Sequence, residues 1–422
     1  MVVNRQSWYL LKETGPSATP LALRETLMQI GNRIPSMKAS GKDGWEIVYR
    51  TRALLAAGEP VVNLTIGEPD RPTDRRVLDA IHAAAVGGLT GYTHGPGLPE
   101  LRVAIAERVT RRTGVPTTAA NVIVTPGGQA ALFAAHMVLL QPGDTGLFVT
   151  PHYPTYPSTI LSTGAACASV AARAEDGFQP RAEAIMAAQQ GTGARSLLVN
   201  TPNNPTGVVY AAETVEGIAA ACRETDLWLI SDEVYDTQVW EGRHLSPRAL
   251  PGMAERTLVI GSMSKSHAMT GSRLGWIVGP EDVIAAATVL ATNTTYGVVP
   301  YIQKGALAAL ALGEALEEEI AAPFRRRRAI VRDAVAGSRA VRVSASAGAM
   351  YVMLDIRATG LSGEEFAHGL LDAERIAVMP GESFGAAAAG HLRVALTLAD
   401  DWLPDALHRI VAHAERVMQQ SG

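Results

Sequence analysis

The chain has 422 residues, with 37 lysines and arginines against 41 aspartates and glutamates, and 47% of its residues are hydrophobic. This apolar content is too high for a disordered chain, and the length suffices for two or three domains. Because the charge is nearly balanced, the sequence lacks the basic excess that binding to nucleic acid or to an anionic membrane requires, and we exclude both partners.

The N-terminal residues lack the features of a secretory signal. Residues 1–32 contain no uninterrupted apolar core followed by a small-residue cleavage site, and we expect them to form an arm. The two cysteines, Cys167 and Cys222, are too few and too far apart for a disulfide framework or a metal-type pair. The long uncharged stretch Thr113–Gly143 is interrupted by prolines and glycines before it could span a bilayer. We therefore predict a cytoplasmic protein.

From Val61 onward, short β-branched runs alternate with alanine-rich helical segments. This alternation is typical of a mostly parallel sheet covered by helices, and it predicts an α/β domain over residues 61–312. The runs expected to form buried strands are Val122–Val124, Leu147–Val149, Leu197–Val199, Leu227–Ile230, Leu258–Ile260 and Trp276–Val278.

The remaining residues, 313–422, predict a smaller α+β domain. It begins with a highly charged helix, Glu314–Ala336, and ends with a helix that starts near Asp401. A helix over Arg33–Gly58, within the segment 33–60, is expected to fold back onto this domain. The strand-like runs between the two end helices are Val341–Val343, Met350–Leu354, Ile376–Val378 and Leu392–Leu396.

Polar residues collect after the predicted strands of the large domain, where open α/β sheets bind ligands. The loop Asn200–Gly207, rich in Asn and Pro, follows the Leu197–Val199 run. A turn alone would also explain its composition. Asp232 follows the Leu227–Ile230 run, and a helix N-cap would also explain that carboxylate.

Two further loops suit an anion. Ser262–Arg273 contains Lys265 and Arg273 among hydroxyls and glycines, although a solvated loop would have the same composition. Thr125–Gln129 leads from a strand directly into a helix and lacks the Gly-Lys-Ser/Thr of a Walker loop.

Together these residues suit pyridoxal phosphate. This cofactor requires a lysine that forms an imine, an acidic partner for its ring nitrogen and an anchor for its phosphate. Lys265 can supply the first and Asp232 the second, while glycines, Ser262 and Arg273 can hold the phosphate. No metal site is predicted.

At this point the sequence resembles a known family, the fold type I pyridoxal-phosphate-dependent aminotransferases of the aspartate aminotransferase superfamily, class I/II. The resemblance runs from about Arg33 to the C-terminus. Its motifs, in chain order, are Gly67–Asp70, Tyr92 with Gly97 and Leu101–Arg102, Thr125–Gln129, Tyr153–Tyr156, Asn203–Gly207, Ser231–Tyr235, Ser262–Arg273 with Gly275–Trp276, and Arg393.

The resemblance implies that Lys265 bonds covalently to the cofactor and later moves the substrate α-proton, while Asp232 keeps the ring nitrogen protonated. It implies that Arg393 grips the substrate α-carboxylate, with Gly67 passing over it and Asn204 nearby. It also implies a homodimer, because Tyr92 would arrive from the neighbouring subunit. The implied cofactor-binding residues are Gly128, Gln129, Tyr153, Asn204, Asp232, Tyr235, Ser262, Ser264, Lys265, Arg273 and Tyr92.

Two departures weaken a dicarboxylate specificity. One subgroup of aspartate aminotransferases has an arginine between the equivalents of Arg273 and Lys304, and this chain has no Lys or Arg between them. Another subgroup has a lysine at the position of Gln129. Further motifs are similar to bacterial arginine–pyruvate transaminases: Trp45–Ile47, Asp226–Trp228, Ser264–Gly271 and Asp355–Arg357.

We therefore expect a ping-pong aminotransferase that favours an arginine-like donor and pyruvate. An aspartate or broad-specificity aminotransferase using 2-oxoglutarate and a β-lyase remain alternatives, because the shared cofactor residues do not determine which bond breaks. Glu46 could face a substrate guanidinium, and an exposed helix carboxylate is the equal alternative. We expect Arg325–Arg328 to be a solvated helix face and His267 to be structural.

Overall fold

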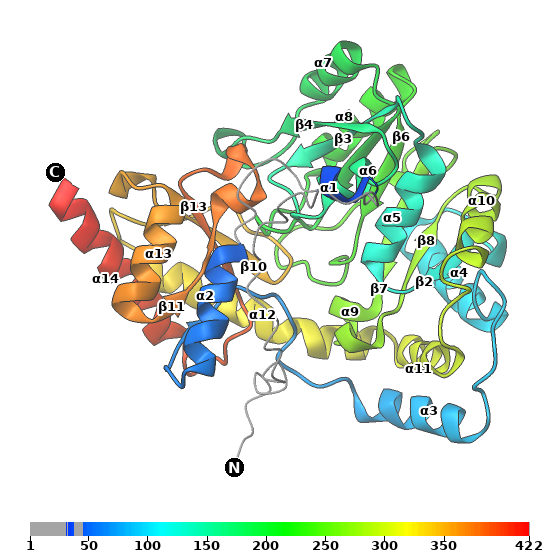
Figure 1. The fold of residues 1–422 in the computed structure, drawn as a ribbon, viewed down its shortest axis with the longest axis horizontal. Helices are drawn as coiled ribbons and strands as arrows, with labels where there is room; N and C mark the ends of the chain where they lie inside the picture. The colour runs from blue at the N-terminus through cyan, green and yellow to red at the C-terminus, as the bar shows by residue number, and fades with distance from the viewer. Residues whose placement is uncertain (1–30, 32, 38–44, 422) are drawn as a thin grey trace, which may run out of the picture.

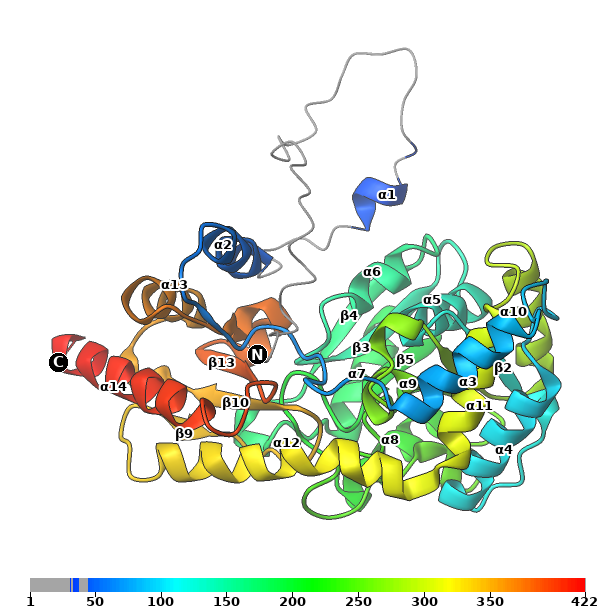
Figure 2. The same ribbon diagram turned by 90° about the horizontal axis from the view of Figure 1, so that it is seen from below.

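A computed structural model describes residue 31, residues 33–37 and residues 45–421. Most of the predicted N-terminal arm lies outside these residues. In the described part, a unit built on a seven-stranded sheet lies beside a smaller unit built on a four-stranded sheet (Figure 1). The long helix α12 (Gly313–Val335) runs along both units (Figure 2). Among the described helices, none combines the length and apolar character needed to cross a membrane.

The large sheet has the strand order β2-β8-β7-β6-β5-β3-β4. Strand β8 is antiparallel to its neighbours β2 and β7, and the other neighbouring strands are parallel, so the predicted mostly parallel sheet is confirmed. The strands are β2 (Val122–Thr125), β3 (Thr145–Thr150), β4 (Ala166–Ala171), β5 (Ser196–Asn200), β6 (Trp228–Asp232), β7 (Thr257–Ser262) and β8 (Gly275–Val278).

Each of the six predicted apolar runs forms one of these strands, but β4 was not predicted. Strand β4 forms the edge of the sheet, and its only fully buried side chain is Val170. Its small, partly exposed residues therefore leave no continuous apolar run in the sequence.

The sheet is covered on both faces because successive strand residues point in opposite directions. In β7, Leu258 and Ile260 pack with residues of α5 and α10, whereas Val259 packs with residues of α4. The helices of this unit are α3 (Arg75–Val86), α4 (Pro99–Thr113), α5 (Gly128–Leu139), α6 (Tyr156–Leu161), α7 (Ala182–Thr192), α8 (Ala212–Glu224), α9 (Met263–Ser266), α10 (Glu281–Thr292) and α11 (Pro300–Ala311).

The smaller unit contains the antiparallel sheet β12-β13-β10-β9 and the parallel pair β1-β11. The β1-β11 pair joins a segment that precedes the large sheet in the chain to a segment near the C-terminus. The elements are β1 (Val62–Asn63), β9 (Arg342–Val343), β10 (Tyr351–Asp355), β11 (Ile376–Ala377), β12 (Met379–Pro380), β13 (His391–Ala395), α13 (Gly363–Glu374) and α14 (Leu403–Ser421). Short 3₁₀ helices are η2 (Ala119–Asn121), η3 (Ala174–Asp176), η4 (Pro247–Ala249), η5 (Thr270–Ser272), η6 (Arg357–Thr359), η7 (Gly381–Phe384) and η8 (Ala386–Ala388).

The predicted helix over Arg33–Gly58 corresponds to two described helices, α1 (Arg33–Ser36) and α2 (Trp45–Ala56). Residues 38–44 between them lie outside the described residues. Helix α2 packs on α13 and β11 in the smaller unit, whereas the carbonyl of Met37, directly after α1, accepts a hydrogen bond from Ser158 of α6.

The prediction of a solvated face at Arg325–Arg328 is wrong for half of the run. The side chains of Arg325 and Arg326 are 46% and 59% exposed, but those of Arg327 and Arg328 are only 5% and 12% exposed. Four consecutive helical residues point in directions about 100° apart. They cannot share one face, and α12 has protein packed on more than one side.

Candidate active site

A cavity of about 540 Å³ lies at the carboxyl ends of β5, β6 and β7 and is lined by residues of both units. Twelve of the residues predicted from the sequence line it: Gly67, Gly128, Gln129, Tyr153, Asn204, Asp232, Tyr235, Ser262, Ser264, Lys265, Arg273 and Arg393. Two predicted residues, Tyr92 and Glu46, are not among the lining residues. The parallel sheet therefore gathers most of the predicted site, although its members are spread over more than 300 residues of sequence.

Asp232 ends strand β6 and is 5% exposed. The hydroxyl of Tyr156 donates a hydrogen bond to Asp232 Oδ2 at 2.6 Å, and the backbone N–H of Val234 donates to Oδ1 at 3.3 Å. Burial raises the pKa of Asp232 to about 6, although the hydrogen bond from Tyr156 opposes the shift. Among the described residues no cation offsets the burial, so this carboxyl suits a cationic ligand.

Lys265 lies on α9, directly after β7. Ser262 caps this short helix, because its Oγ accepts a hydrogen bond from the N–H of Ser264 at 3.1 Å. The Lys265 Nζ donates to the carbonyl oxygen of Gly67 at 2.6 Å. Burial lowers the pKa of the Lys265 ammonium, which favours the neutral, nucleophilic amine.

His267 follows two residues later but does not line the cavity. Its Nδ1 lies 2.7 Å from the hydroxyl of Ser266, and the ring is 1% exposed. Burial lowers the pKa of His267 to about 3, so the ring is neutral at physiological pH. These contacts agree with a structural role.

The N-terminus of α5 forms an anion cradle with Arg273. Gly127 caps the helix with φ +87°, and no side chain accepts from the first N–H groups. A Cβ on Gly127 would lie 2.5 Å from Arg273 Nη2, so glycine lets the guanidinium approach the backbone. Gly128, Gln129 and Ser262 line the cavity at the same place. Helix N–H groups, hydroxyls and a guanidinium together suit a phosphate.

Arg393 lies on β13, at the opposite side of the cavity from the large sheet. Its guanidinium lies over the rings of Tyr351 and Phe384, at 4.6 and 4.7 Å from their centroids. It donates to Asn204 Oδ1 at 3.0 Å and to the carbonyl of Thr65. The buried Nε has no hydrogen-bond partner in the described part of the chain. A buried donor without a partner suits a carboxylate ligand.

Three tyrosines lie around the lysine and the arginine. The hydroxyls of Tyr235 and Tyr351 are 3.3 Å apart, and Tyr153 lines the cavity on the side of α6. Burial raises the pKa of Tyr235 above its ordinary value. The hydroxyl of Tyr235 therefore stays protonated, and either hydroxyl of the pair can be the donor.

Tyr92 lies outside the cavity of its own chain. It is 90% exposed, and its ring meets that of Tyr296 edge to face with centroids 5.0 Å apart. Two aromatic rings on an exposed surface suit a protein contact.

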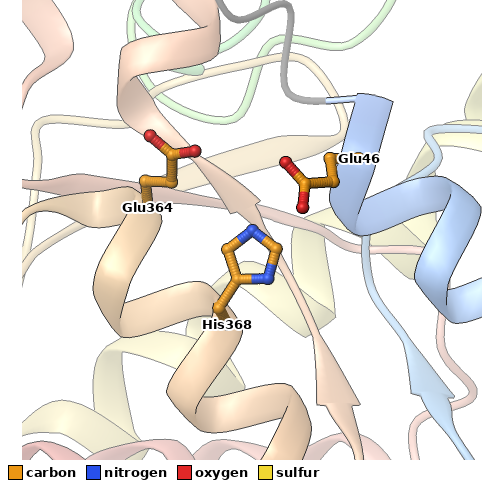
Figure 3. A group of neighbouring side chains, drawn as sticks. All are labelled: Glu46, Glu364 and His368. Atoms are coloured by element: carbon orange, nitrogen blue, oxygen red, sulfur yellow. The ribbon is translucent and has the colours of Figure 1, made fainter.

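Glu46 lies on α2 and does not line the cavity. Figure 3 shows its carboxylate facing Glu364 and His368 of α13. Arg50 Nη1 lies 2.6 Å from His368 Nδ1, and a guanidinium can only donate. Nδ1 is therefore the acceptor, and its lone pair is occupied by Arg50. Glu46 is not among the lining residues, so the geometry does not support contact between Glu46 and a ligand in the cavity.

Sequence reasoning missed several residues of the cavity. Tyr156 begins α6 three positions after Tyr153, and a turn in which its N–H donates to the carbonyl of Tyr153 brings the two ring centroids to 6.0 Å. Tyr351 sits in a predicted strand run, but nothing local indicated that it would contact both Tyr235 and Arg393. Glu68 was noted only as part of a motif, yet it lines the cavity and accepts from Thr270 Oγ1 at 2.6 Å.

The lining of the cavity contains both charged and apolar residues. The described cations that line it are Lys265, Arg273 and Arg393, and the carboxylates are Glu68 and Asp232. One part of the wall is apolar and consists of Trp45, Val48, Ile66, Met379 and Phe384. Such a wall can hold a methylene chain.

Comparisons with known proteins agree with this geometry. The family model for aminotransferase class I and II matches residues 59–410. The chain is 40% identical to arginine–pyruvate transaminase AruH of Pseudomonas aeruginosa, over 90% of this chain and 97% of that protein. It is 36% identical to the aspartate/prephenate aminotransferase of Thermus thermophilus, again over 90% and 97% of the two chains.

A solved structure of aspartate aminotransferase from Thermus thermophilus with maleate superposes on this chain with a TM-score of 0.86 and 33% identity. The match covers 92% of this chain and all of that one.

Proposed function

The chain belongs to the class I and II aminotransferases, a family of pyridoxal-phosphate-dependent enzymes, and from that premise we propose how its cavity works and which substrates it takes. The cycle is ping-pong: an L-amino acid gives up its α-amino group and leaves as a 2-oxo acid, and a second 2-oxo acid takes the amino group. The fold and the enzyme class follow from the family, whereas the residue roles and substrates below are proposals.

The lining residues fit pyridoxal phosphate. The uncapped N-terminus of α5, Ser262 and Arg273 would hold the phosphate, and Asp232 would face the protonated ring nitrogen. Tyr153 would cover the ring, while Asn204 and Tyr235 would bind its phenolic oxygen. When bound, the cofactor supplies an electron sink that stabilises negative charge at the substrate α-carbon.

Two residues of the chain would act on the substrate: Lys265 transfers a proton, and Arg393 binds the carboxylate. Lys265 Nζ takes the proton from the α-carbon, because its buried amine is neutral more readily than an exposed lysine. Arg393 binds the α-carboxylate with its free Nε and its guanidinium edge, and the flanking Tyr351 and Phe384 rings keep that guanidinium from rotating. This places the α-carbon between Arg393 and Lys265.

The preferred donor in this proposal is arginine or a similar cationic amino acid, with pyruvate as the acceptor. The observation that supports this preference is the number of cations that line the cavity. Lys265, Arg273 and Arg393 each have a role already, so no described lining cation remains for a second substrate carboxylate. The apolar wall suits the methylene stem of arginine, and its guanidinium would face Glu68, a carboxylate that lines the cavity, in place of Glu46.

The aspartate aminotransferase alternative, with 2-oxoglutarate as acceptor, is favoured by the 36% identical relative of Thermus thermophilus. It requires a cation from outside the described residues of one chain. A partner subunit could supply one, since the exposed Tyr92 and Tyr296 suit a homodimer in which Tyr92 enters the partner's site.

A half-reaction screen tests the proposal. The purified enzyme with bound cofactor is mixed with single L-amino acids without an acceptor, and loss of the cofactor absorbance band is followed. Fast loss with arginine and none with aspartate is the expected result. Fast loss with aspartate would favour the alternative, and ammonia release without an acceptor would favour a β-lyase.

A further inference from the structure

Arg327 is the most buried of the four consecutive arginines of α12, and all three of its nitrogen positions donate hydrogen bonds. Nη2 donates to Asp70 Oδ2 at 2.7 Å, and Nε donates to Asp400 Oδ1 at 2.7 Å. Nη1 donates to the carbonyl of Leu396 at 2.9 Å. With 5% of its side chain exposed, this guanidinium joins two stretches of chain that are more than 300 residues apart.

The first stretch, Thr65–Asp70, is called the 65–70 segment below. Its members contact the cavity at several points. The carbonyl of Thr65 accepts from Arg393, and the carbonyl of Gly67 accepts from Lys265 Nζ. A Cβ on Gly67 would lie 1.8 Å from the hydroxyl of Tyr351, so the segment packs tightly against the cavity wall. Asp70 is the last residue of this segment, and its carboxylate binds Arg327.

The second stretch follows β13, the strand that carries Arg393. Leu396 comes directly after this strand, and Asp400 lies four residues further on. The hydroxyl of Thr397 also donates to the carbonyl of Ile66 at 3.2 Å. The end of β13 and the 65–70 segment are therefore neighbours, and Arg327 is the charged group between them.

We propose that Arg327 is a positioning residue for substrate binding, which sets the distance between the 65–70 segment and Arg393 so that the two grip an amino acid together. This inference rests on the proposed function, in which Arg393 binds the α-carboxylate and Gly67 lies over it. Arg327 touches neither the cavity nor the reacting atoms. It acts through Asp70 on one side and through Leu396 and Asp400 on the other.

The neighbouring Arg326 provides a matched control. It also binds Asp400, through Nε to Oδ2 at 3.1 Å, but its side chain is 59% exposed and does not contact Asp70. Exposed ion pairs contribute little. The two arginines thus share one partner and differ in whether they reach the 65–70 segment.

The test compares holoenzymes carrying Arg327→Met, Arg327→Lys and Arg326→Met, using the amino acid that reacts fastest with the wild type. We expect Arg327→Met to raise KM for that amino acid by about 10-fold to 10²-fold with kcat changed far less, because a misplaced binding group weakens substrate binding throughout the reaction. Arg327→Lys should restore part of the affinity, and Arg326→Met should match the wild type. Cofactor affinity, measured by spectroscopic titration of the apoenzyme, should be equal in all four proteins.

Asp70→Asn keeps the test decisive if Arg327→Met does not fold, because Arg327 retains Asp400 in that variant. It should raise KM as Arg327→Met does, and the double variant should be no worse than either single one. Unchanged KM in the folded Arg327 and Asp70 variants, or a loss of cofactor affinity equal to the loss of substrate affinity, would overturn the inference alone. A wild type that binds the cofactor but reacts with no amino acid would overturn the proposed function and this inference together.

Discussion

Two groups of charged residues with buried members occur in this molecule, and they are neutralised in different ways. Asp232 and Asp236 are four residues apart. Asp236 lies between Arg108, at 2.8 Å, and Arg112, at 3.0 Å, and Glu317 contacts the same two arginines. Although burial alone would raise it, the two arginines hold the pKa of Asp236 well below its ordinary value. Asp232 has no such partners, and burial raises its pKa to about 6.

The cluster of Arg108, Arg112, Asp236 and Glu317 is thus a closed set of two cations and two anions, called the ionic cluster below. The cavity instead contains Asp232 without a cation and Arg393 with a donor that has no partner among the described residues. A buried charge that the protein does not neutralise is destabilising unless a ligand completes it. We infer that the paired charges of the ionic cluster stabilise the fold, whereas the unpaired groups of the cavity bind a ligand.

The largest effect is expected from Lys265→Ala, which removes the buried amine of the cavity. Without the amine no group is left to take the α-proton, and we expect turnover to fall by about 10³-fold or more. The fold should persist. Steady-state kinetics and the absorbance spectrum of the lysine-bound cofactor measure the effect, and a variant with full activity would contradict the mechanism.

A substitution in the ionic cluster should lower stability and leave activity unchanged, the reverse of the effect expected for Lys265→Ala. Arg108→Met leaves Asp236 and Glu317 buried with one arginine, and breaking such a set costs on the order of 3–5 kcal/mol. We expect the free energy of unfolding in urea to fall by this amount, while activity per folded molecule changes little. Arg111→Met, at an exposed position of the same helix, is the control. A stability equal to that of the control would remove the distinction between the two groups.

Asp232→Asn tests the charge that lacks a partner. The pKa of Asp232 is higher in the folded chain than the ordinary 3.8, so the folded state binds this proton more tightly than the unfolded state does. The contribution of this protonated carboxyl to the free energy of unfolding is present below about pH 4 and is lost as the pH rises through about 6. About two pKa units correspond to roughly 3 kcal/mol.

We therefore expect the Asp232→Asn apoenzyme to match the wild type near pH 4 and to be the more stable of the two near pH 7. Thermal unfolding of both apoenzymes across this range measures the difference. The same variant should bind the cofactor more weakly. A wild type as stable as the variant at pH 7 would show that Asp232 has a partner in the free protein.

The smallest effect is expected at Glu68, which lines the cavity. Glu68→Gln should lower kcat/KM for arginine relative to alanine by about fivefold, since a partly exposed ion pair contributes about 1 kcal/mol. Glu46→Gln should leave the ratio unchanged, because Glu46 faces α13 (Figure 3). The opposite result would place the guanidinium at Glu46 and would restore the prediction made from the sequence.

The sequence predicted the sheet well because buried parallel strands are continuous apolar runs, and it predicted the cavity because polar groups follow those runs at one edge. It failed where the outcome depends on contacts between distant segments. Nothing in the run Arg325–Arg328 indicates that Arg327 meets Asp70 and Asp400, and the apolar character of β4 is too weak to recognise. The contact of Glu46 with α13 could not be predicted for the same reason, since nothing local indicates whether a carboxylate on α2 faces the cavity or another helix.

Residue roles were predictable only in part. Lys265, Asp232 and Arg273 follow from the chemistry that pyridoxal phosphate requires, and the structure brings them to one cavity. Tyr156 and Tyr351 lie in the same cavity, but their contributions arise from hydrogen bonds and ring contacts that no local pattern encodes.

Helix α12 carries Glu317 of the ionic cluster and, ten residues later, Arg327. Over this distance the helix, which contains Pro323, is about 15 Å long and fixes the angle between its two ends. Inserting a single residue between them would turn one end by about 100° relative to the other, so one of the two ion-paired groups would have to break. Variation in length should therefore be absent from this stretch of the helix, even though several of its side chains are exposed and free to change.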